Sequence, residues 1–134
     1  MTSTDYADHA SHTGAQPLPA AKGSVYKGKV VMLINEEAIS RAEHACLFFE
    51  AATDVTFIGT PTQGANGDVT LMVLPGNLPI SFSGHDIRHA DGRQLQRLGI
   101  QPHVKVAPTI RGKIEGRDEI LDAAIKHLHK SLKK

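Results

Sequence analysis

Ser40-Arg41-Ala42-Glu43 is the segment of this sequence whose residue types and spacing best suit chemistry. A serine three residues before a glutamate, at the start of an apolar helical pattern, is typical of a capping box, in which each residue's side chain accepts a hydrogen bond from a free backbone N–H group. The same position suits a nucleophile, because the free N–H groups and the positive end of the helix dipole can stabilise an oxyanion. These four residues alone leave both interpretations open.

A serine nucleophile needs a base within hydrogen-bond reach, and the histidines are the first candidates. His44 follows Ser40 by four residues, which would place their Cβ atoms about 5–6 Å apart on a helix. Such neighbours rarely aim their side chains at one another, so a base role for His44 is the less favoured interpretation. His85 and His89 fall in a strand and loop region, where either could lie near the site, but polar loop histidines are the favoured interpretation.

We predict neither a metal site nor a cofactor. His127 and His129 are two residues apart on a predicted helix and cannot share one face, which excludes a metal pair there. The single cysteine, Cys46, lies among apolar helical positions and is expected to be a buried, inert thiol. Gly64-Ala-Asn-Gly67 lacks the lysine and the following helix of a phosphate-binding loop, so we expect a turn.

The elements around Ser40 form a strand, a helix and a second strand. Residues 29–35 are a continuous apolar run that ends in a turn residue, the pattern of a strand buried on both faces. Apolar residues then recur at helical spacing as far as Ala52. Residues 55–59 form the next short strand. Because the joints are short, the order predicts an α/β fold with a βαβ unit, in which the two strands are parallel and the helix packs across them.

The rest of the chain is expected to be a tail, a hairpin and a final helix. Residues 1–24 are rich in small and polar residues without a hydrophobic period and predict a disordered tail or linker. Residues 61–67 are predicted to be a loop, 69–74 and 78–82 a hairpin, and the region of Val104 and Val106 a short strand. A helix is predicted to start at Asp118, whose acidic start and basic end suit the helix dipole.

The bulk composition excludes some partners. The chain has 134 residues and a formal net charge of +1, so no excess of basic residues points to nucleic acid or to an anionic membrane. It contains neither an apolar run of about 18 residues, as a transmembrane helix requires, nor a signal peptide. The compartment is left open.

The ordered set of segments resembles the C-terminal-processing family of serine peptidases, which includes tail-specific and tricorn-core-like proteases. The resemblance covers about residues 26–130 and depends on five segments in the right order with similar spacing. These segments are Val30–Asn35, Ser40–Glu43, Gly59-Thr60-Pro61-Thr62-Gln63-Gly64, Asp91-Gly92-Arg93 with Gly99–Val104, and the helix from Asp118. The resemblance implies that residues 25–134 are the C-terminal part of a peptidase catalytic domain, a ClpP/crotonase-like half-domain with a mixed sheet and flanking helices.

The resemblance also implies roles for individual residues. Ser40 matches the nucleophile, the backbone N–H of Arg41 matches one oxyanion donor, and the segment with Gly64, Ala65, Asn66 and Gly67 would contact the substrate. Ala65 stands where tail-specific members carry a lysine base, which excludes a serine–lysine dyad. Tricorn-like members instead use a histidine from the N-terminal part of the domain together with a glutamate.

At the position of that glutamate the chain has Gln96, which can form hydrogen bonds but carries no charge. We therefore expect peptide-bond hydrolysis through an acyl-enzyme only when an N-terminal portion supplies the base. The alternative is a non-catalytic module of the same fold that binds peptide or an apolar ligand. Uncovered strand edges predict self-association, which light scattering would detect. A peptide or protein substrate is the expected partner.

Overall fold

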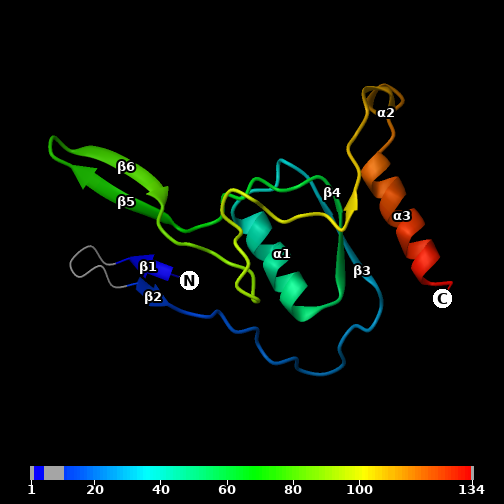
Figure 1. Ribbon diagram of the computed structural model, residues 1–134, viewed down its shortest axis with the longest axis horizontal. Helices are drawn as coiled ribbons and strands as arrows, with labels where there is room; N and C mark the ends of the chain where they lie inside the picture. The colour runs from blue at the N-terminus through cyan, green and yellow to red at the C-terminus, as the bar shows by residue number, and fades with distance from the viewer. Residues whose placement is uncertain (1, 5–10, 134) are drawn as a thin grey trace.

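A computed structural model describes residues 2–4 and 11–133 (Figure 1). Its strands and helices are, in chain order, β1 (Thr2–Thr4), β2 (Ser11–Thr13), β3 (Val30–Ile34), α1 (Arg41–Ala52), β4 (Val55–Gly59), β5 (Val69–Leu74), β6 (Leu78–Ser83), β7 (Val104–Lys105), α2 (Ile110–Ile114) and α3 (Glu119–Ser131).

The centre of the molecule is a three-stranded parallel sheet with the order β3-β4-β7. Strand β4 pairs with β3 from Val30↔Val55 to Ile34↔Gly59, and with β7 from Ile58↔Val104. Helix α1 connects β3 to β4, which confirms the predicted βαβ unit. Because both pairs are parallel, the Ser40 loop after β3 and the loop after β4 leave the same edge of the sheet.

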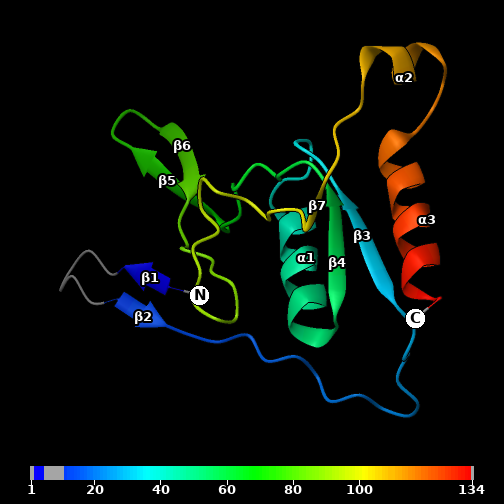
Figure 2. The ribbon, with the colours of Figure 1, turned by 45° about the vertical axis from the view of Figure 1, so that its right-hand side comes forward.

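Two helices cover the two faces of this sheet, α1 on one side and α3 on the other (Figure 2). Alternating side chains of the central strand supply both interfaces, as its length and apolar run require. Phe57 belongs to the core cluster that includes Cys46 of α1, and Ile58 belongs to the cluster with Ile120 and Ala124 of α3. Both strand side chains are almost fully buried.

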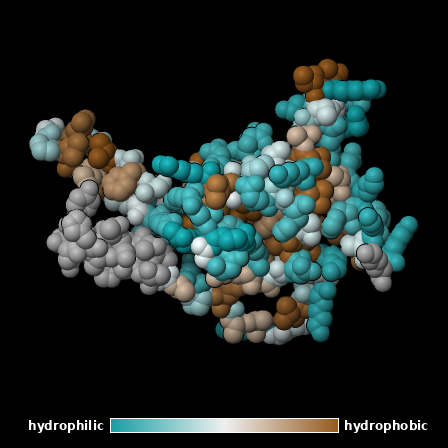
Figure 3. Space-filling model, viewed as in Figure 1, coloured by the Kyte–Doolittle hydropathy of each residue, from teal (hydrophilic) through white to brown (hydrophobic). Residues whose placement is uncertain are grey.

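The expected mixed sheet is wrong for the described part of the chain. Strands β5 and β6 pair antiparallel with each other and form a separate two-stranded hairpin, while the central sheet is parallel. The hairpin extends away from the body of the molecule and carries a brown, apolar cluster of side chains (Figure 3). Its register places Met72, Leu74, Leu78, Ile80 and Phe82 on one face, and each of them is between 37% and 59% exposed. A hairpin of this kind is at most marginally stable in water by itself. Self-association through this face stays a prediction.

The N-terminal region contains short strands where a disordered tail was expected. β1 and β2 pair antiparallel, with Thr2 opposite Thr13, and residues 14–29 are largely exposed without regular strands or helices. The short helix α2 was not predicted, because a single turn is too short to show a helical period. The hydroxyl of Thr109 caps it by accepting from the N–H of Gly112 at 2.9 Å. Within residues 2–4 and 11–133, no helix is long and apolar enough to cross a membrane.

Candidate active site

Ser40 is held in an unusual backbone conformation at the N-terminus of α1. Its φ is 53° and its ψ is −110°. A residue with a side chain pays about 1–3 kcal/mol for such sparsely populated angles, and they persist only where the surroundings impose them. Residues of this kind cluster at functional sites, so the backbone is the first observation that separates Ser40 from an ordinary helix cap, which has extended angles.

The hydrogen bonds around Ser40 also differ from those of a simple cap. The Ser40 N–H donates to Glu43 Oε2 at 3.2 Å, which is the glutamate half of a capping box. The other half of the box, a contact from the Glu43 N–H to the Ser40 side chain, is also present, but it falls short of a side-chain cap hydrogen bond. The Ser40 hydroxyl is therefore not engaged in a full cap hydrogen bond.

Arg41 is the first residue of α1, and its N–H belongs to the group of helix-start donors that have no partner within a helix. The next N–H, that of Ala42, donates to Ile39 O at 3.1 Å, and His44 N–H donates to Ser40 O at 3.0 Å. Among the described residues the Arg41 N–H makes no such bond. A donor at the positive end of a helix, directly after Ser40, suits an oxyanion.

Glu43 links the start of α1 to the loop after β4. Its side chain is fully buried and accepts four hydrogen bonds. Besides the Ser40 N–H, the donors are Thr62 Oγ1 at 2.6 Å, the Gly64 N–H at 2.6 Å and the Ala65 N–H at 3.0 Å. A buried carboxylate is tolerated only when it is paired or fully hydrogen-bonded, and here backbone and hydroxyl donors satisfy it. This network determines where the loop lies relative to Ser40.

The loop after β4 is fixed on its other side by the segment before β7. Thr62 N–H donates to Ile100 O at 3.2 Å, and Ile100 N–H donates to Thr62 Oγ1 at 2.8 Å. Gly64 and Gly99 both have φ near +70° and lie where the two backbones cross. The strands and the helix therefore position the candidate site through two crossed loops that Glu43 and Thr62 connect.

Ser40 lines a pocket of about 320 Å³ at the N-terminal end of α1. Arg41, His44, Ala45 and Phe48 contribute from the helix, Gln16 from the N-terminal segment, and Asn66 and Asp68 from the loop that precedes β5. Nothing in the sequence around Gln16, Phe48 and Asp68 predicts that they line this pocket. They come together only through tertiary contacts.

His44 shares the pocket with Ser40, but its ring nitrogens contact other side chains. Nε2 lies 3.0 Å from Gln16 Oε1, and Nδ1 lies 3.4 Å from Asn66 Nδ2. Because an amide oxygen only accepts, Nε2 carries the hydrogen, and Nδ1 faces the amide donor. Both nitrogens of His44 are thus occupied by neutral amides, which disfavours the role of base for Ser40.

Gln96 does not line the Ser40 pocket. Its Nε2 donates to His85 O at 3.1 Å, while its Oε1 is buried and has no hydrogen-bond partner among the described residues. His85 Nδ1 lies 3.6 Å from Asp68 Oδ2, and Asp68 does line the pocket. The Gln96 amide thus donates only to the backbone of His85, whose Nδ1 makes no hydrogen bond among the described residues, so no hydrogen-bonded path joins Gln96 to the pocket.

The four residues expected to contact substrate divide into two groups. Asn66 lines the Ser40 pocket. Gly64 and Ala65 direct their N–H groups to Glu43, and Gly67 packs against His85 O and the Ser83 side chain. These three residues shape the loop through their backbone.

Cys46 behaves as expected of an inert thiol. It is 2% exposed, and burial, helped by the nearby carboxylates of Glu43 and Glu50, raises its pKa to about 11. The thiolate needed for nucleophilic chemistry or metal binding is therefore disfavoured. Within the described ranges, no group of three or more histidine, cysteine, aspartate or glutamate side chains could hold a metal ion.

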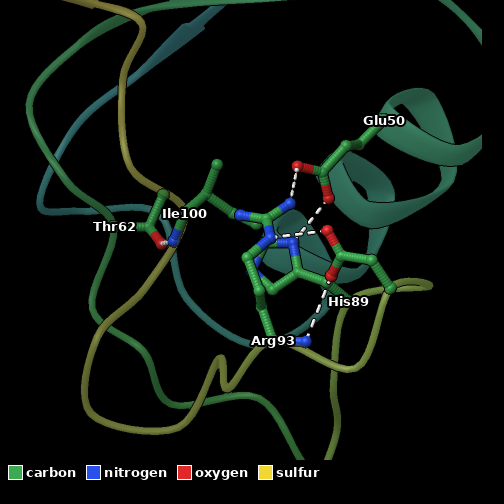
Figure 4. A network of polar contacts seen from close by, with 6 residues as sticks. Glu50, Thr62, His89, Arg93 and Ile100 are labelled. Carbon is green, nitrogen blue, oxygen red and sulfur yellow. Dashed lines mark hydrogen bonds and ion pairs between the residues drawn. The ribbon is translucent and has the colours of Figure 1, made fainter.

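A second charged network fastens the loop after β6 to the C-terminal half of α1 (Figure 4). Glu50 Oε2 contacts His89 Nδ1 at 2.5 Å, and Glu50 Oε1 accepts from Arg93 Nη2 at 2.8 Å. The His89 side chain is only 4% exposed. Burial raises the pKa of Glu50, but the hydrogen bonds from His89 and Arg93 outweigh it and leave the pKa below its ordinary value.

We expect this lowered pKa to make the fold acid-sensitive. A carboxylate whose pKa is depressed in the folded state stabilises the fold above its unfolded pKa, about 4.3, and this contribution disappears as the pH falls through the folded value. Glu50→Gln should thus lower the melting temperature at pH 7 and flatten its decline below about pH 5. Thermal melts of both proteins across this range measure the effect. Parallel melting curves at all pH values would contradict it.

These features define an α/β domain that presents a strained serine at a helix N-terminus above a pocket, and comparison with known proteins gives the family. The model of peptidase family S41 matches residues 2–106. The chain belongs to this family of serine peptidases, which the tail-specific and tricorn-like proteases represent, and the resemblance seen in the sequence is confirmed.

Individual proteins and solved structures are also similar to this chain. A protein of Chlamydia pneumoniae is 32% identical over 89 residues, which are 64% of this chain and 14% of that protein. The crystal structure of a presumed peptidase from Parabacteroides merdae superposes with a TM-score of 0.74 at 26% identity, covering 83% of this chain and 35% of that one. The tricorn protease superposes with a TM-score of 0.64 at 23% identity, over 81% of this chain and 11% of that one, and so supports the fold.

The chain thus spans a minor part of the length of the relatives it matches. The residues that it does contain correspond to a mixed α/β region with a parallel βαβ sheet.

Proposed function

We propose that this chain carries the nucleophile of a serine-type peptidase and that Ser40 forms the acyl-enzyme. The observation that carries the proposal is the backbone of Ser40, which is strained at φ 53° directly before the Arg41 N–H, a donor without a partner among the described residues. This arrangement places the Ser40 hydroxyl beside a donor that can stabilise an oxyanion. Membership of peptidase family S41 supports the same role.

In the proposed reaction, Ser40 Oγ forms a bond to the carbonyl carbon of the scissile peptide while its proton passes to a base. The N–H of Arg41 stabilises the oxyanion, the C–N bond breaks, and the base returns the proton to the leaving amine. Water then hydrolyses the ester by the same route and restores the serine. Asn66 would contact the substrate. Gly64, Ala65 and Gly67 would shape the loop that carries Asn66.

The base must come from outside the described residues in this proposal. Within residues 11–133, no hydrogen bond joins the Ser40 hydroxyl to a histidine or lysine. Ala65, at the position of the lysine base, has a methyl side chain that cannot accept a proton. The described part of the chain would then be one half of a ClpP/crotonase-like domain, which a further segment completes. The buried Oε1 of Gln96 is an acceptor without a partner among the described residues and could orient an incoming histidine.

A non-catalytic binding module of the same fold is the second candidate. The observation that favours it is the engagement of both His44 nitrogens by Gln16 and Asn66, which leaves the Ser40 pocket without a free histidine or lysine among the described residues. Such a module would bind peptide or an apolar ligand and release it unchanged.

Labelling with a fluorophosphonate probe tests the role of Ser40, with and without a polypeptide that supplies the N-terminal part of the domain. We expect the completed domain to be labelled and the Ser40→Ala and Ser40→Gly variants to be unlabelled. Ser40→Gly should in addition raise the free energy of unfolding by about 1 kcal/mol, because glycine adopts a positive φ without strain.

The control is Ser81→Ala, a substitution on the exposed hairpin that should leave labelling unchanged. A helix cap would behave differently, because Ser40→Ala would then cost about 1 kcal/mol and glycine a few tenths, with no effect on labelling. A completed, folded domain in which Ser40 stays unlabelled rejects the peptidase proposal.

A further inference from the structure

A second hollow, here called the apolar groove, continues from the Ser40 pocket along α1. It has a volume of about 390 Å³ and is lined by three segments, residues 14–18, the 44–51 face of α1 and residues 86–92. Gln16, His44 and Phe48 line both the groove and the Ser40 pocket, so the two are neighbours on one surface. Its volume falls within the usual range of ligand clefts.

The geometry of α1 sets the distance between the groove and Ser40. The residues that α1 contributes, His44, Leu47, Phe48 and Ala51, recur at helical spacing and therefore share one face. With a rise of 1.5 Å per residue, Leu47 lies about 10 Å along the helix from Ser40. An extended peptide advances about 3.3 Å per residue. The groove is thus about three residues of extended substrate away from the nucleophile.

The walls of the groove are apolar, and the charged groups at its rim already have partners. Leu18, Leu47, Phe48 and Ile87 supply apolar surface. Arg88 is paired with Asp86 at 2.8 Å, and His89 is held by Glu50. Because Asp86 neutralises Arg88 and the His89 ring is hydrogen-bonded to Glu50, these groups offer no unpaired charge to a ligand, and the groove favours an uncharged apolar side chain.

We infer that the apolar groove is a specificity subsite for a large apolar side chain, such as leucine or phenylalanine, about three residues from the scissile bond of a polypeptide. This inference rests on the proposed function, because the Ser40 pocket defines where the bond lies. Continuity with that pocket distinguishes the groove from an isolated apolar hollow. The occupant is therefore the substrate chain itself.

The test measures binding separately from catalysis. A set of fluorescein-labelled decapeptides of glycine and serine, each with one leucine at a different position, is titrated against the domain, completed by its N-terminal part and carrying Ser40→Ala. Fluorescence anisotropy gives the affinity. In a second set, each peptide carries a phosphonate warhead at a fixed position and reacts with the completed domain that has Ser40 intact. The position of the leucine can then be counted from the atom that Ser40 attacks. We expect leucine three or four residues from the warhead to accelerate labelling about tenfold over serine, and leucine peptides to bind correspondingly tighter.

Ala51→Trp is the variant that fills the groove, and Ala52→Trp, one residue further along α1 and outside the groove lining, is its matched control. Ala51→Trp should abolish the leucine preference while labelling by a small fluorophosphonate continues, and Ala52→Trp should keep both. A preference that survives Ala51→Trp, or that is missing in the unsubstituted protein, overturns the inference even when Ser40 is labelled. Leucine-dependent binding that Ala51→Trp abolishes, in a protein that is never labelled, keeps the groove as a binding site and rejects the peptidase function.

Discussion

Glu43→Gln is expected to lower the free energy of unfolding by about 2–4 kcal/mol and to slow labelling of Ser40. The Glu43 carboxylate accepts from the N–H groups of Ser40, Gly64 and Ala65 and from the hydroxyl of Thr62. Glutamine has one accepting oxygen and an amide that only donates, so the amide would face backbone or hydroxyl donors at a position where the side chain is fully buried. Each buried donor left without a partner costs about 1–3 kcal/mol. Chemical denaturation measures the loss.

The matched control is Glu37→Gln, which makes the same chemical change at an exposed position just before α1. Surface substitutions of this kind stay within about 0.5 kcal/mol. If Glu43→Gln also stays within that range, the buried network does not hold the two loops, and the position of Ser40 needs another explanation. A loss of labelling without a loss of stability would place Glu43 in the reaction rather than in the framework.

The sequence predicted the elements whose information is local. The apolar run Val30–Ile34 is the parallel strand β3, and the helical period before Ala52 corresponds to α1. The expected burial of this strand on both faces is wrong, because β3 lies at the edge of the sheet, where only Ile34 is buried and Leu33 is 44% exposed. The final helix begins after Asp118, whose side chain accepts from the N–H of Leu121 at 3.0 Å as a cap should. Hydrophobic period and capping residues act over a few neighbours, which is why they can be recognised without a structure.

The loops and the site were less predictable because their contacts join distant segments. In the sequence, Glu43 was interpreted as half of a local capping box. In the structure, three of its four donors lie 19 to 22 residues further along the chain. Gln16 enters the Ser40 pocket from 28 residues before His44. The hairpin was predicted, but its separation from the central sheet was not, because strand patterns specify pairing and not which sheet a pair joins.

A backbone crossing beside the site has a large predicted effect. Gly64 has φ +68°, and a Cβ added to it would lie 2.6 Å from Gly99 N and 2.7 Å from Leu98 N. Both neighbours are backbone atoms and cannot rotate away as a side chain would. The Gly64 carbonyl also accepts from the N–H of Arg97 at 2.7 Å, so the two loops are bound together at this point.

Gly64→Ala should therefore lower the free energy of unfolding by more than the left-handed backbone conformation alone explains. Gly116→Ala is the matched control, because Gly116 has the same φ of +68° with nothing within 4 Å of the added Cβ. The control should lose roughly 1–2 kcal/mol of unfolding free energy for the backbone conformation, and Gly64→Ala a further 1–3 kcal/mol for the forced separation of the loops. Denaturation of the two variants isolates the crossing as their difference. Since the Gly64 and Ala65 N–H groups anchor Glu43, separating the loops should also slow Ser40 labelling in Gly64→Ala and leave it unchanged in Gly116→Ala. Equal losses in both variants would show that the loops can part without cost, and Glu43 alone would then position the serine.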